Sequence, residues 1–172
     1  MIYRLRAILN ATEDVFRDIE IESDATLEDF HNVLTQTFQL QGDEMASFYV
    51  SDEDWNQGEE YCLFDMSEGA SPVKKMQDTQ MKDVMDKSNT RMIYIYDFLN
   101  MWSFTIELAD VAGPLDGASY PQVIFEMGTL PDSPPDPEFE ADPRFTEDED
   151  ENDDQYGDDE EFYEDYDDNE FY

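Results

Sequence analysis

Few side chains in this sequence could take part in acid-base or nucleophilic chemistry. His31 is the only histidine and Cys62 the only cysteine among 172 residues, so a catalytic triad or a multi-histidine metal site has one candidate residue of each type. Proton transfer between His31 and Asp97 is the strongest enzymatic candidate, and a thiolate pair of Cys62 with His31 is another. The glycines form no phosphate-binding loop and no nucleophile-elbow motif occurs. We predict no catalytic residue and no cofactor, and we keep an enzyme or metal site centred on Asp97 and His31 as an alternative.

Both rare residues occupy positions where burial is the simpler explanation. His31 lies on the apolar face of a predicted helix, and we expect its ring at the edge of the core, hydrogen-bonded to backbone or to a carboxylate. Cys62 lies in the apolar run of residues 61–64, which predicts a buried and unreactive thiol. A lone cysteine also excludes an internal disulfide, so the chain needs no oxidising compartment.

Asp97 follows an apolar strand and begins a turn. A carboxylate in such a position most often accepts hydrogen bonds from turn amides, and it could equally bond the indole of Trp102 or an arginine such as Arg17 or Arg91. The functional alternative is a pocket at this end of the hairpin, rimmed by Tyr96, Asp97 and Trp102. With His31 as the fourth member, these residues form the candidate pocket.

One acidic segment resembles a calcium-binding loop. The sequence D-E-D-W-N-Q-G at residues 52–58 places acids or amides at Asp52, Asp54 and Asn56. The glycine comes one place too late, and Leu63 stands at the twelfth position, where a bidentate Glu is needed. We expect diffuse cation binding here and no dedicated metal site.

The candidate pocket belongs to the densest apolar stretch of the chain, R-M-I-Y-I-Y-D-F-L-N-M-W-S-F-T-I-E-L at residues 91–108. Two runs of period two, rich in β-branched and aromatic residues, predict two strands. Asn100 tolerates positive φ, so we expect it to shape a tight turn between them. The prediction is an antiparallel hairpin near the centre of a sheet, with its first strand buried on both faces and its second on one.

The segments before this hairpin predict the layer that supports it. Residues 3–9 and 15–22 alternate as the strands of an N-terminal hairpin. Thr26 and Asp29 form a capping box before a helix that ends ahead of Gly42, and its apolar face carries Leu27, Phe30, His31, Leu34 and Phe38. Further strands are predicted at 45–50, 61–64 and 123–127, with 52–60 as a polar loop. The fold class is α+β: a β-hairpin, a helix, then a mixed or antiparallel sheet in a β-grasp-like layer.

The charge balance is extreme, with 46 acidic and 9 basic residues and a formal net charge of −37. Such a field repels nucleic-acid phosphate and anionic membranes, so we expect neither as a direct ligand and regard basic proteins as the natural partners. Mutual repulsion also favours a monomer. No segment approaches the ~20 apolar residues of a membrane-spanning helix, and the N-terminus lacks the apolar core of a signal peptide. We expect a cytoplasmic protein.

The composition changes after the last predicted strand. Prolines become frequent, and from Thr146 onward the chain has 16 acidic residues and no Lys or Arg. We predict a folded domain of residues 1–140 and a disordered acidic-aromatic tail of residues 141–172. Its aromatic side chains could dock on a basic or apolar surface; they are Tyr156, Phe162, Tyr163, Tyr166, Phe171 and Tyr172.

The order of four short segments is specific enough to indicate a family. They are Y-R-L-R at 3–6, F-R-D-I-E-I at 16–21, F-H-N-V-L-T-Q-T-F at 30–38 and Y-I-Y-D-F at 94–98. Through them residues 1–139 resemble the plasmid pRiA4b Orf-three-like family of small, mobile-element-associated proteins, also labelled passenger TnpR-type. The family hairpin reads Y-D-F-G-D-x-W-x-H. This chain has Leu99, Asn100 and Phe104 in place of the Gly, second Asp and His. The resemblance implies a shared fold, and it implies that any polar or metal site at the hairpin is eroded here.

These observations favour a binding protein over an enzyme. We predict a non-enzymatic binding or adaptor module that acts through its acidic surface and tail on a basic protein partner. A degenerate enzyme or metal site at Asp97 and His31 is one alternative. A mobile-element accessory, or a protein whose carboxylates mimic DNA phosphates, is another.

Overall fold

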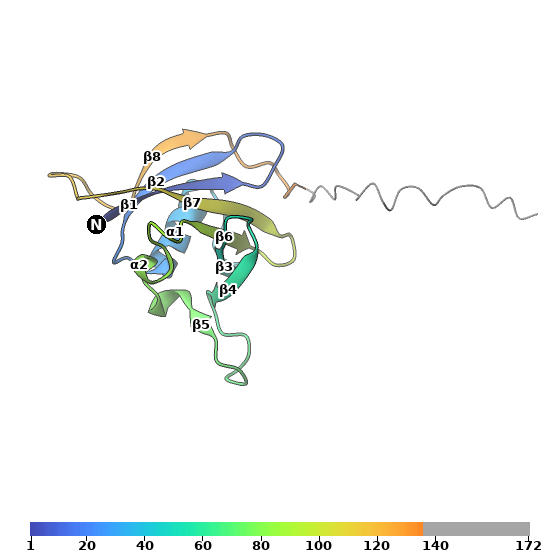
Figure 1. The fold of residues 1–172 in the computed structure, drawn as a ribbon. Coiled ribbons are helices and arrows are strands. Elements are labelled where there is room, and N and C mark those ends of the chain that lie inside the picture. The colour runs from blue at the N-terminus through green and yellow to red at the C-terminus, as the bar shows by residue number, and fades with distance from the viewer. Residues whose placement is uncertain (136–172) are drawn as a thin grey trace, which may run out of the picture. The chain divides into compact units, whose positions relative to one another are not determined.

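A computed structural model describes residues 1–135 as one α+β domain (Figure 1). Its eight-stranded sheet has the order β5-β4-β3-β6-β7-β1-β2-β8. The strands are β1 (Ile2–Leu9), β2 (Phe16–Glu22), β3 (Ala46–Ser51), β4 (Gln57–Cys62), β5 (Lys74–Lys75), β6 (Arg91–Tyr96), β7 (Trp102–Ala112) and β8 (Gln122–Met127). The helices are α1 (Leu27–Thr37), the single 3-10 turn η1 (Met76–Asp78) and α2 (Met81–Val84). All strand pairs are antiparallel except β4 with β5. The predicted α+β class with a mixed sheet is confirmed.

The N-terminal hairpin and the helix form as the residue pattern predicts. β1 pairs with β2 from Ile2 opposite Glu22 to Ile8 opposite Phe16. The Thr26 hydroxyl accepts a hydrogen bond from the Asp29 amide, and the Asp29 carboxylate accepts one from the Thr26 amide. This reciprocal cap satisfies two otherwise unpaired helix amides and starts α1 at Leu27.

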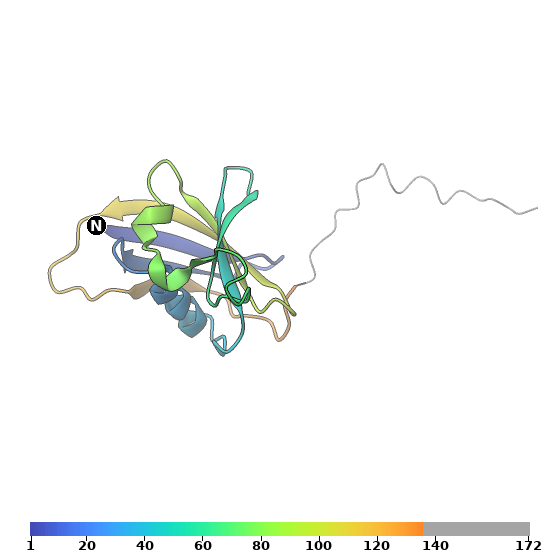
Figure 2. The same cartoon turned by 90° about the horizontal axis from the view of Figure 1, so that it is seen from below.

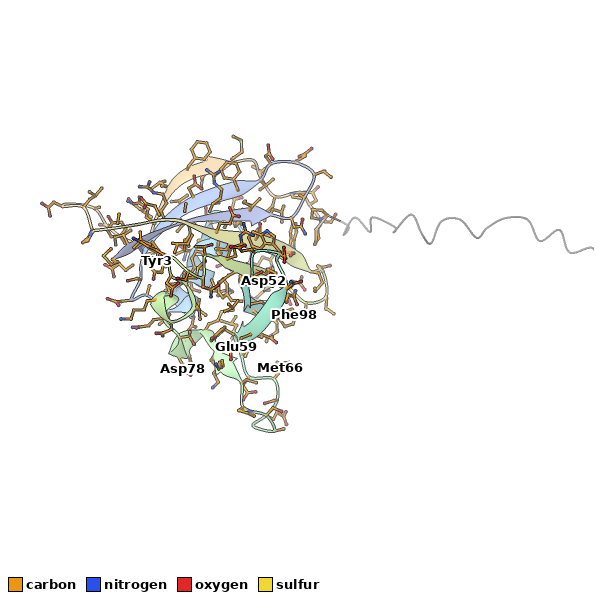
Figure 3. All side chains as sticks on the ribbon, viewed as in Figure 1. Tyr3, Asp52, Glu59, Met66, Asp78 and Phe98 are labelled. Carbon is orange, nitrogen blue, oxygen red and sulfur yellow. The ribbon has the colours of Figure 1, made fainter. Side chains whose placement is uncertain are left out.

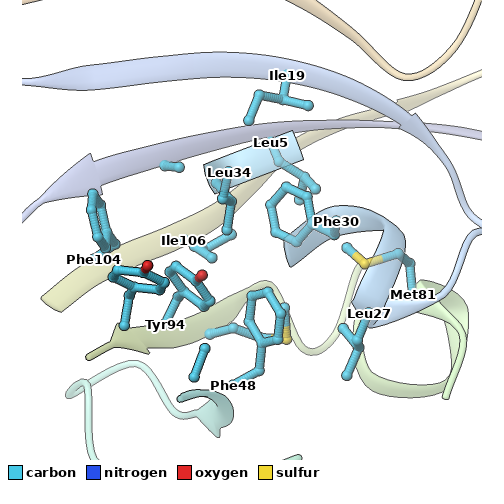
Figure 4. Close-up of a cluster of buried hydrophobic side chains, with 14 of the residues drawn as sticks. Leu5, Ile19, Leu27, Phe30, Leu34, Phe48, Met81, Tyr94, Phe104 and Ile106 are labelled. Carbon is cyan, nitrogen blue, oxygen red and sulfur yellow. The ribbon is translucent and has the colours of Figure 1, made fainter. Parts of the chain in front are cut away.

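The core fills the space between α1 and the inner face of the sheet (Figures 1 and 2). Phe30 and Leu34 of α1 are fully buried, as are Phe48, Tyr94 and Phe104 from the sheet. The four aromatic rings among them lie close to one another (Figure 4). Phe48 and Tyr94 have ring centroids 4.8 Å apart, and Tyr94 and Phe104 are 5.7 Å apart. These contacts anchor the centre of the sheet to the helix.

The hairpin of residues 91–108 occupies the middle of the sheet, as predicted. β6 and β7 pair from Arg91 opposite Glu107 to Tyr96 opposite Trp102. β6 is buried on both faces, and the first half of β7 is buried on one. The turn differs from the prediction, because positive φ falls on Asp97 and Met101, at 61° and 59°, and not on Asn100.

A second difference concerns β4. Residues 57–60 were expected in a polar loop, but they form most of β4, which ends at Cys62. Three polar residues and a glycine, all exposed, give this part of β4 no alternation, because both of its faces meet solvent. Leu63 and Phe64, expected in the strand, follow it as loop.

Within residues 1–135, no helix is both long and apolar enough to cross a membrane. The predicted boundary at residues 140 and 141 and the whole predicted tail lie outside the described residues. The six aromatic residues proposed for the tail, from Tyr156 to Tyr172, lie there too.

Candidate functional site

Asp97 organises the turn between β6 and β7. Its carbonyl accepts a hydrogen bond from the Met101 amide at 2.6 Å. Its carboxylate accepts bonds from the Leu99 amide at 3.1 Å, the Asn100 amide at 3.3 Å and the Asn100 side-chain amide at 2.5 Å. The Asn100 side chain and these amides lower the pKa of Asp97. The carboxylate is therefore occupied as a turn cap, and its hydrogen-bond partners among residues 1–135 include neither Trp102 nor an arginine.

Replacing Asp97 with Ala should lower the free energy of unfolding by about 2 kcal/mol, because three donors lose their acceptor and Ala is strained at positive φ. Asp97→Asn keeps an acceptor and tolerates this backbone, so we expect less than half of that loss. Urea denaturation of both variants measures the difference. A loss below about 0.5 kcal/mol in the Asp97→Ala variant would show that the cap contributes nothing.

On one side of this turn lies a hollow of about 520 Å³, named here the Arg17 hollow. Four segments that are distant in sequence line it: Arg17 in β2, residues 38–44 after α1, the Asp97 turn, and residues 129–132 after β8. Tyr96, Asp97 and Trp102 all contribute to its wall. His31 is not among the lining residues, so the structure brings three of the four predicted pocket residues together.

Arg17 is the residue that the candidate pocket lacked. It is buried, with 5% of its surface exposed, and its guanidinium carbon lies 4.9 Å from the centre of the Phe38 ring. Nη1 donates to the carbonyls of Phe16 and Met127, both at 2.8 Å, and Nε donates to the Thr37 carbonyl at 3.4 Å. The signal in the sequence is that Arg17 takes an inward position in the alternation of β2, where Ile19 and Ile21 are also buried.

His31 lies in the core beneath the sheet, 3% exposed. Its Nδ1 shares a hydrogen bond of 2.7 Å with the Tyr94 hydroxyl. The expected partner was backbone or a carboxylate, and the observed partner is a phenol. Burial lowers the pKa of His31 to about 4 and raises that of Tyr94 well above 10. At neutral pH both groups are uncharged, and the pair is a satisfied polar contact inside the core.

On the other side of the turn lies a second hollow of about 470 Å³, the Phe98 hollow. Its apolar lining consists of Met45, Phe64, Met66, Pro72, Val73 and Phe98. Phe64 is 58% exposed and Met66 is 73% exposed, which is unusual for side chains of this size. Glu59, Met66 and Phe98 lie in the same part of the domain, beside the loop that follows β4 (Figure 3).

Cys62 also lines the Phe98 hollow. It is only partly buried, in contrast to the expected full burial, because Tyr61 takes the inward position at the end of β4 and Cys62 the outward one. Burial raises the pKa of its thiol, so the thiolate is scarce at neutral pH. Its thiol donates to the Lys74 carbonyl and not to His31, which lies in the core.

The Asp52 loop is held together by its own side chains. The Asp52 carboxylate accepts hydrogen bonds from the Asp54 and Asn56 amides and from the Asn56 side chain. These bonds, chiefly those of Asn56, lower the pKa of Asp52. Across residues 1–135, no cluster of three or more His, Cys, Asp or Glu side chains is arranged to hold a metal ion.

Most basic residues of the domain are already paired with acids. Residues 1–135 carry 26 acidic and 8 basic side chains, and six of the eight lie within 4 Å of a carboxylate. On the outer face of the sheet, Arg4 pairs with Glu20 and Arg6 with Asp18. The unpaired charges of the described surface are therefore overwhelmingly negative.

Comparison with known proteins places this fold. Residues 1–171 match the family model described as plasmid pRiA4b ORF-3-like protein. A crystal structure of a protein of unknown function from Methanosarcina mazei Go1 has a TM-score of 0.64 and 17% identity, with 73% of this chain and 68% of that chain covered. At this identity the likeness shows the fold alone, and no curated protein matches the sequence. The chain belongs to the plasmid pRiA4b ORF-3-like family.

Proposed function

We propose that this protein is a non-enzymatic binding module for a basic protein segment that also carries large apolar side chains. The observation that carries this proposal is the Phe98 hollow, an apolar concavity on a strongly acidic domain. Large exposed apolar patches are rare on monomers and mark interaction sites. The partner's apolar side chains would enter the hollow, and its cationic residues would meet the surrounding carboxylates.

The shape of the hollow supports a peptide-like occupant. Phe98 and Val73 are each about two-fifths exposed, so they offer ring and methyl surface without being free in solvent. Leu99, at the tip of the adjoining turn, is 93% exposed and extends the apolar surface. Burying several such side chains at one interface contributes about 1.5–3 kcal/mol each.

The electrostatics select a cationic partner. Lys74, the one cation in the lining, is paired with Glu59. The nearby loop carries Asp65 and Glu68, and the domain as a whole has 18 more acidic than basic residues. An acidic field accelerates the association of a basic segment and repels anionic competitors. The acidic tail, whose sequence continues this charge, would add to the attraction.

The alternatives find less support. An enzyme built on His31 and Asp97 would need both groups in one site, but His31 is a neutral core residue and the Asp97 carboxylate is occupied by its turn. A DNA mimic would need unpaired acids arranged along one face, whereas Arg4, Arg6 and Arg91 interrupt the acids on the outer face of the sheet. A free thiol suits a reducing compartment, so the cytoplasm is our proposed location. Mutual repulsion between acidic copies favours a monomer, which is our proposed state.

A peptide pair tests the proposal on the full chain. A Lys/Leu peptide that forms an amphipathic helix should bind, and the Phe64→Ser/Met66→Ser double variant should weaken it about tenfold or more, because two apolar contacts are lost. Fluorescence anisotropy measures the affinities. Because Cys62 is the only cysteine and lines the hollow, bound peptide should also slow its alkylation.

Three controls sharpen the result. Leu115→Ser changes an exposed leucine of another loop, 69% exposed, and should leave binding unchanged. A Lys/Ser peptide of equal charge should bind weakly and equally to all forms. Equal binding of the Lys/Leu peptide to wild type and double variant would disprove the role of the hollow. If a chain ending at residue 145 loses binding that the double variant keeps, the tail is the binding element.

A further inference from the structure

Arg17 is a buried cation with no carboxylate within hydrogen-bond distance among residues 1–135. The nearest is Glu126, whose Oε1 lies 3.8 Å from Nε, beyond hydrogen-bond distance, and whose side chain is 61% exposed. The contacts of Arg17 within the described residues are three carbonyls and the Phe38 ring. Buried charges are normally paired, because removing an ion from water is costly. The carbonyls hold the guanidinium in place but leave its charge uncompensated.

The Arg17 guanidinium is not fully bonded by the described residues, and Arg17 lines the hollow. Nη1 donates both of its protons to carbonyl oxygens, and Nε donates its one proton to the Thr37 carbonyl in a long bond. Nη2 has no hydrogen-bond partner among residues 1–135. No buried side-chain nitrogen or oxygen of that range lacks a partner, so Nη2 keeps contact with solvent. Since Arg17 lines the hollow, Nη2 is the donor that a ligand there can bond without displacing a carbonyl. A carboxylate that bonds Nη2 can also bond Nε, in place of the long contact with Thr37, and so make two parallel hydrogen bonds with this edge.

Part of the wall of the hollow is apolar. Phe38, Leu40, Trp102 and Leu130 line it together with polar residues. Phe38 and Trp102 are almost fully buried, whereas Leu40 and Leu130 are partly exposed, so the two leucines offer most of the apolar contact. A volume of about 520 Å³ lies in the usual range for small-molecule sites.

The rim carries the opposite charge. Asp43, Glu44 and Asp132 line the same hollow, and Asp43 and Glu44 are exposed. Asp43 also accepts a 3.4 Å hydrogen bond from the Tyr96 hydroxyl. Three acids around one buried cation repel a multiply charged anion such as phosphate, and they attract an ammonium group on a ligand whose carboxylate has reached Arg17.

We propose that the Arg17 hollow binds a small zwitterion of the size and chemistry of an aromatic amino acid. The carboxylate pairs with the Nε–Nη2 edge of Arg17, the apolar body packs against Leu40 and Leu130 beside Trp102, and the ammonium group faces Asp43 and Glu44. The site is independent of the Phe98 hollow, so the proposed peptide-binding function and this one can fail separately.

Three probes that differ by one charged group test the assignment on the full chain. L-phenylalanine has both groups, 3-phenylpropionate lacks the ammonium and phenethylamine lacks the carboxylate. The readout is the nuclear magnetic resonance signal of the Trp102 indole, which Trp55→Phe distinguishes from the only other tryptophan. L-phenylalanine should shift it at the lowest concentration, with the two truncated probes weaker by about tenfold or more, the effect of losing one charge-assisted bond.

Variants with opposite expected effects make the test decisive. Arg17→Gln should abolish binding, and circular dichroism shows whether it folds. Glu126→Gln removes the carboxylate that competes for Nε and should tighten binding, a gain that unfolding cannot mimic. Glu53→Gln, at the far end of β3, changes the net charge equally and should have no effect.

The outcomes that overturn the proposal are equally concrete. If phenethylamine binds as tightly as L-phenylalanine, the carboxylate is not recognised and the role of Arg17 is wrong. If 3-phenylpropionate matches L-phenylalanine, the acidic rim does not select an ammonium group. If no probe shifts the Trp102 indole up to its solubility limit, or if Glu126→Gln behaves like Glu53→Gln, the hollow does not bind this class of ligand.

Discussion

Replacing Phe104 with Ala should lower the free energy of unfolding by about 3–5 kcal/mol, the usual cost of emptying a buried phenylalanine site. Phe104 is completely buried near the start of β7, and its ring centroid lies 4.7 Å from that of Phe38 and 5.7 Å from that of Tyr94. It joins the helix side of the core to the central hairpin, so its loss leaves a cavity between elements that cannot collapse independently. Urea denaturation followed by far-ultraviolet circular dichroism measures the change.

Leu99→Ala is the matched control for this variant. Leu99 lies five residues earlier in the same hairpin but is 93% exposed, so its truncation should change the unfolding free energy by about 0.5 kcal/mol or less. A loss below about 1 kcal/mol in the Phe104→Ala variant would contradict the packing described for the centre of the sheet. The contrast also tests the position at which this chain carries Phe in place of the His of its family's hairpin pattern.

Lowering the pH from 7.5 to 5 should cost the domain about 2 kcal/mol of stability through His31 alone. The unfolded chain takes up a proton at this residue near pH 6.5, whereas burial holds the folded pKa at about 4. Between these values the unfolded state binds more protons, so stability falls as pH falls and the full penalty is reached below pH 4. Urea denaturation at half-unit pH steps from 7.5 to 5 measures this slope.

His31→Gln isolates the histidine from the many carboxylates. Glutamine has no charge to gain, and its amide can bond the Tyr94 hydroxyl in place of Nδ1. The variant should be less stable than wild type at pH 7.5, and the gap should close as the pH approaches 5. Parallel curves for the two proteins would mean that His31 titrates normally in the folded state and is not enclosed as described.

Local elements of this fold were open to prediction because their signals lie within a few residues. The reciprocal cap of Thr26 and Asp29 marks the start of α1, and period-two alternation marks β1, β2 and the central hairpin. β4 was not predicted because its first four residues, three polar ones and a glycine, are all exposed, so no alternation of apolar and polar residues marks them. The turn was mislocated at Asn100 because several polar residues tolerate positive φ, and the hydrogen bonds of the Asp97 carboxylate decide among them.

The candidate site was predictable in part. The sequence groups Tyr96, Asp97 and Trp102 as the rim of a pocket because they flank one turn, and in the structure they line one hollow. Arg17 was considered as a partner of Asp97 and not as a site residue, because a charged residue inside an alternating strand is usually solvated. His31 was grouped with them by its chemistry, but the helix faces it into the core against Tyr94.

By itself, the sequence determined the α+β class, the capped helix, the central hairpin and the acidic charge, since each depends on the types and short-range spacing of residues. Only the tertiary structure decided which residues meet. β1 pairs with β7 and β2 with β8 across about a hundred positions, and no local period encodes such pairing. That pairing brings Arg17, residues 129–132 and the Asp97 turn around one hollow, and it leaves the single histidine outside it.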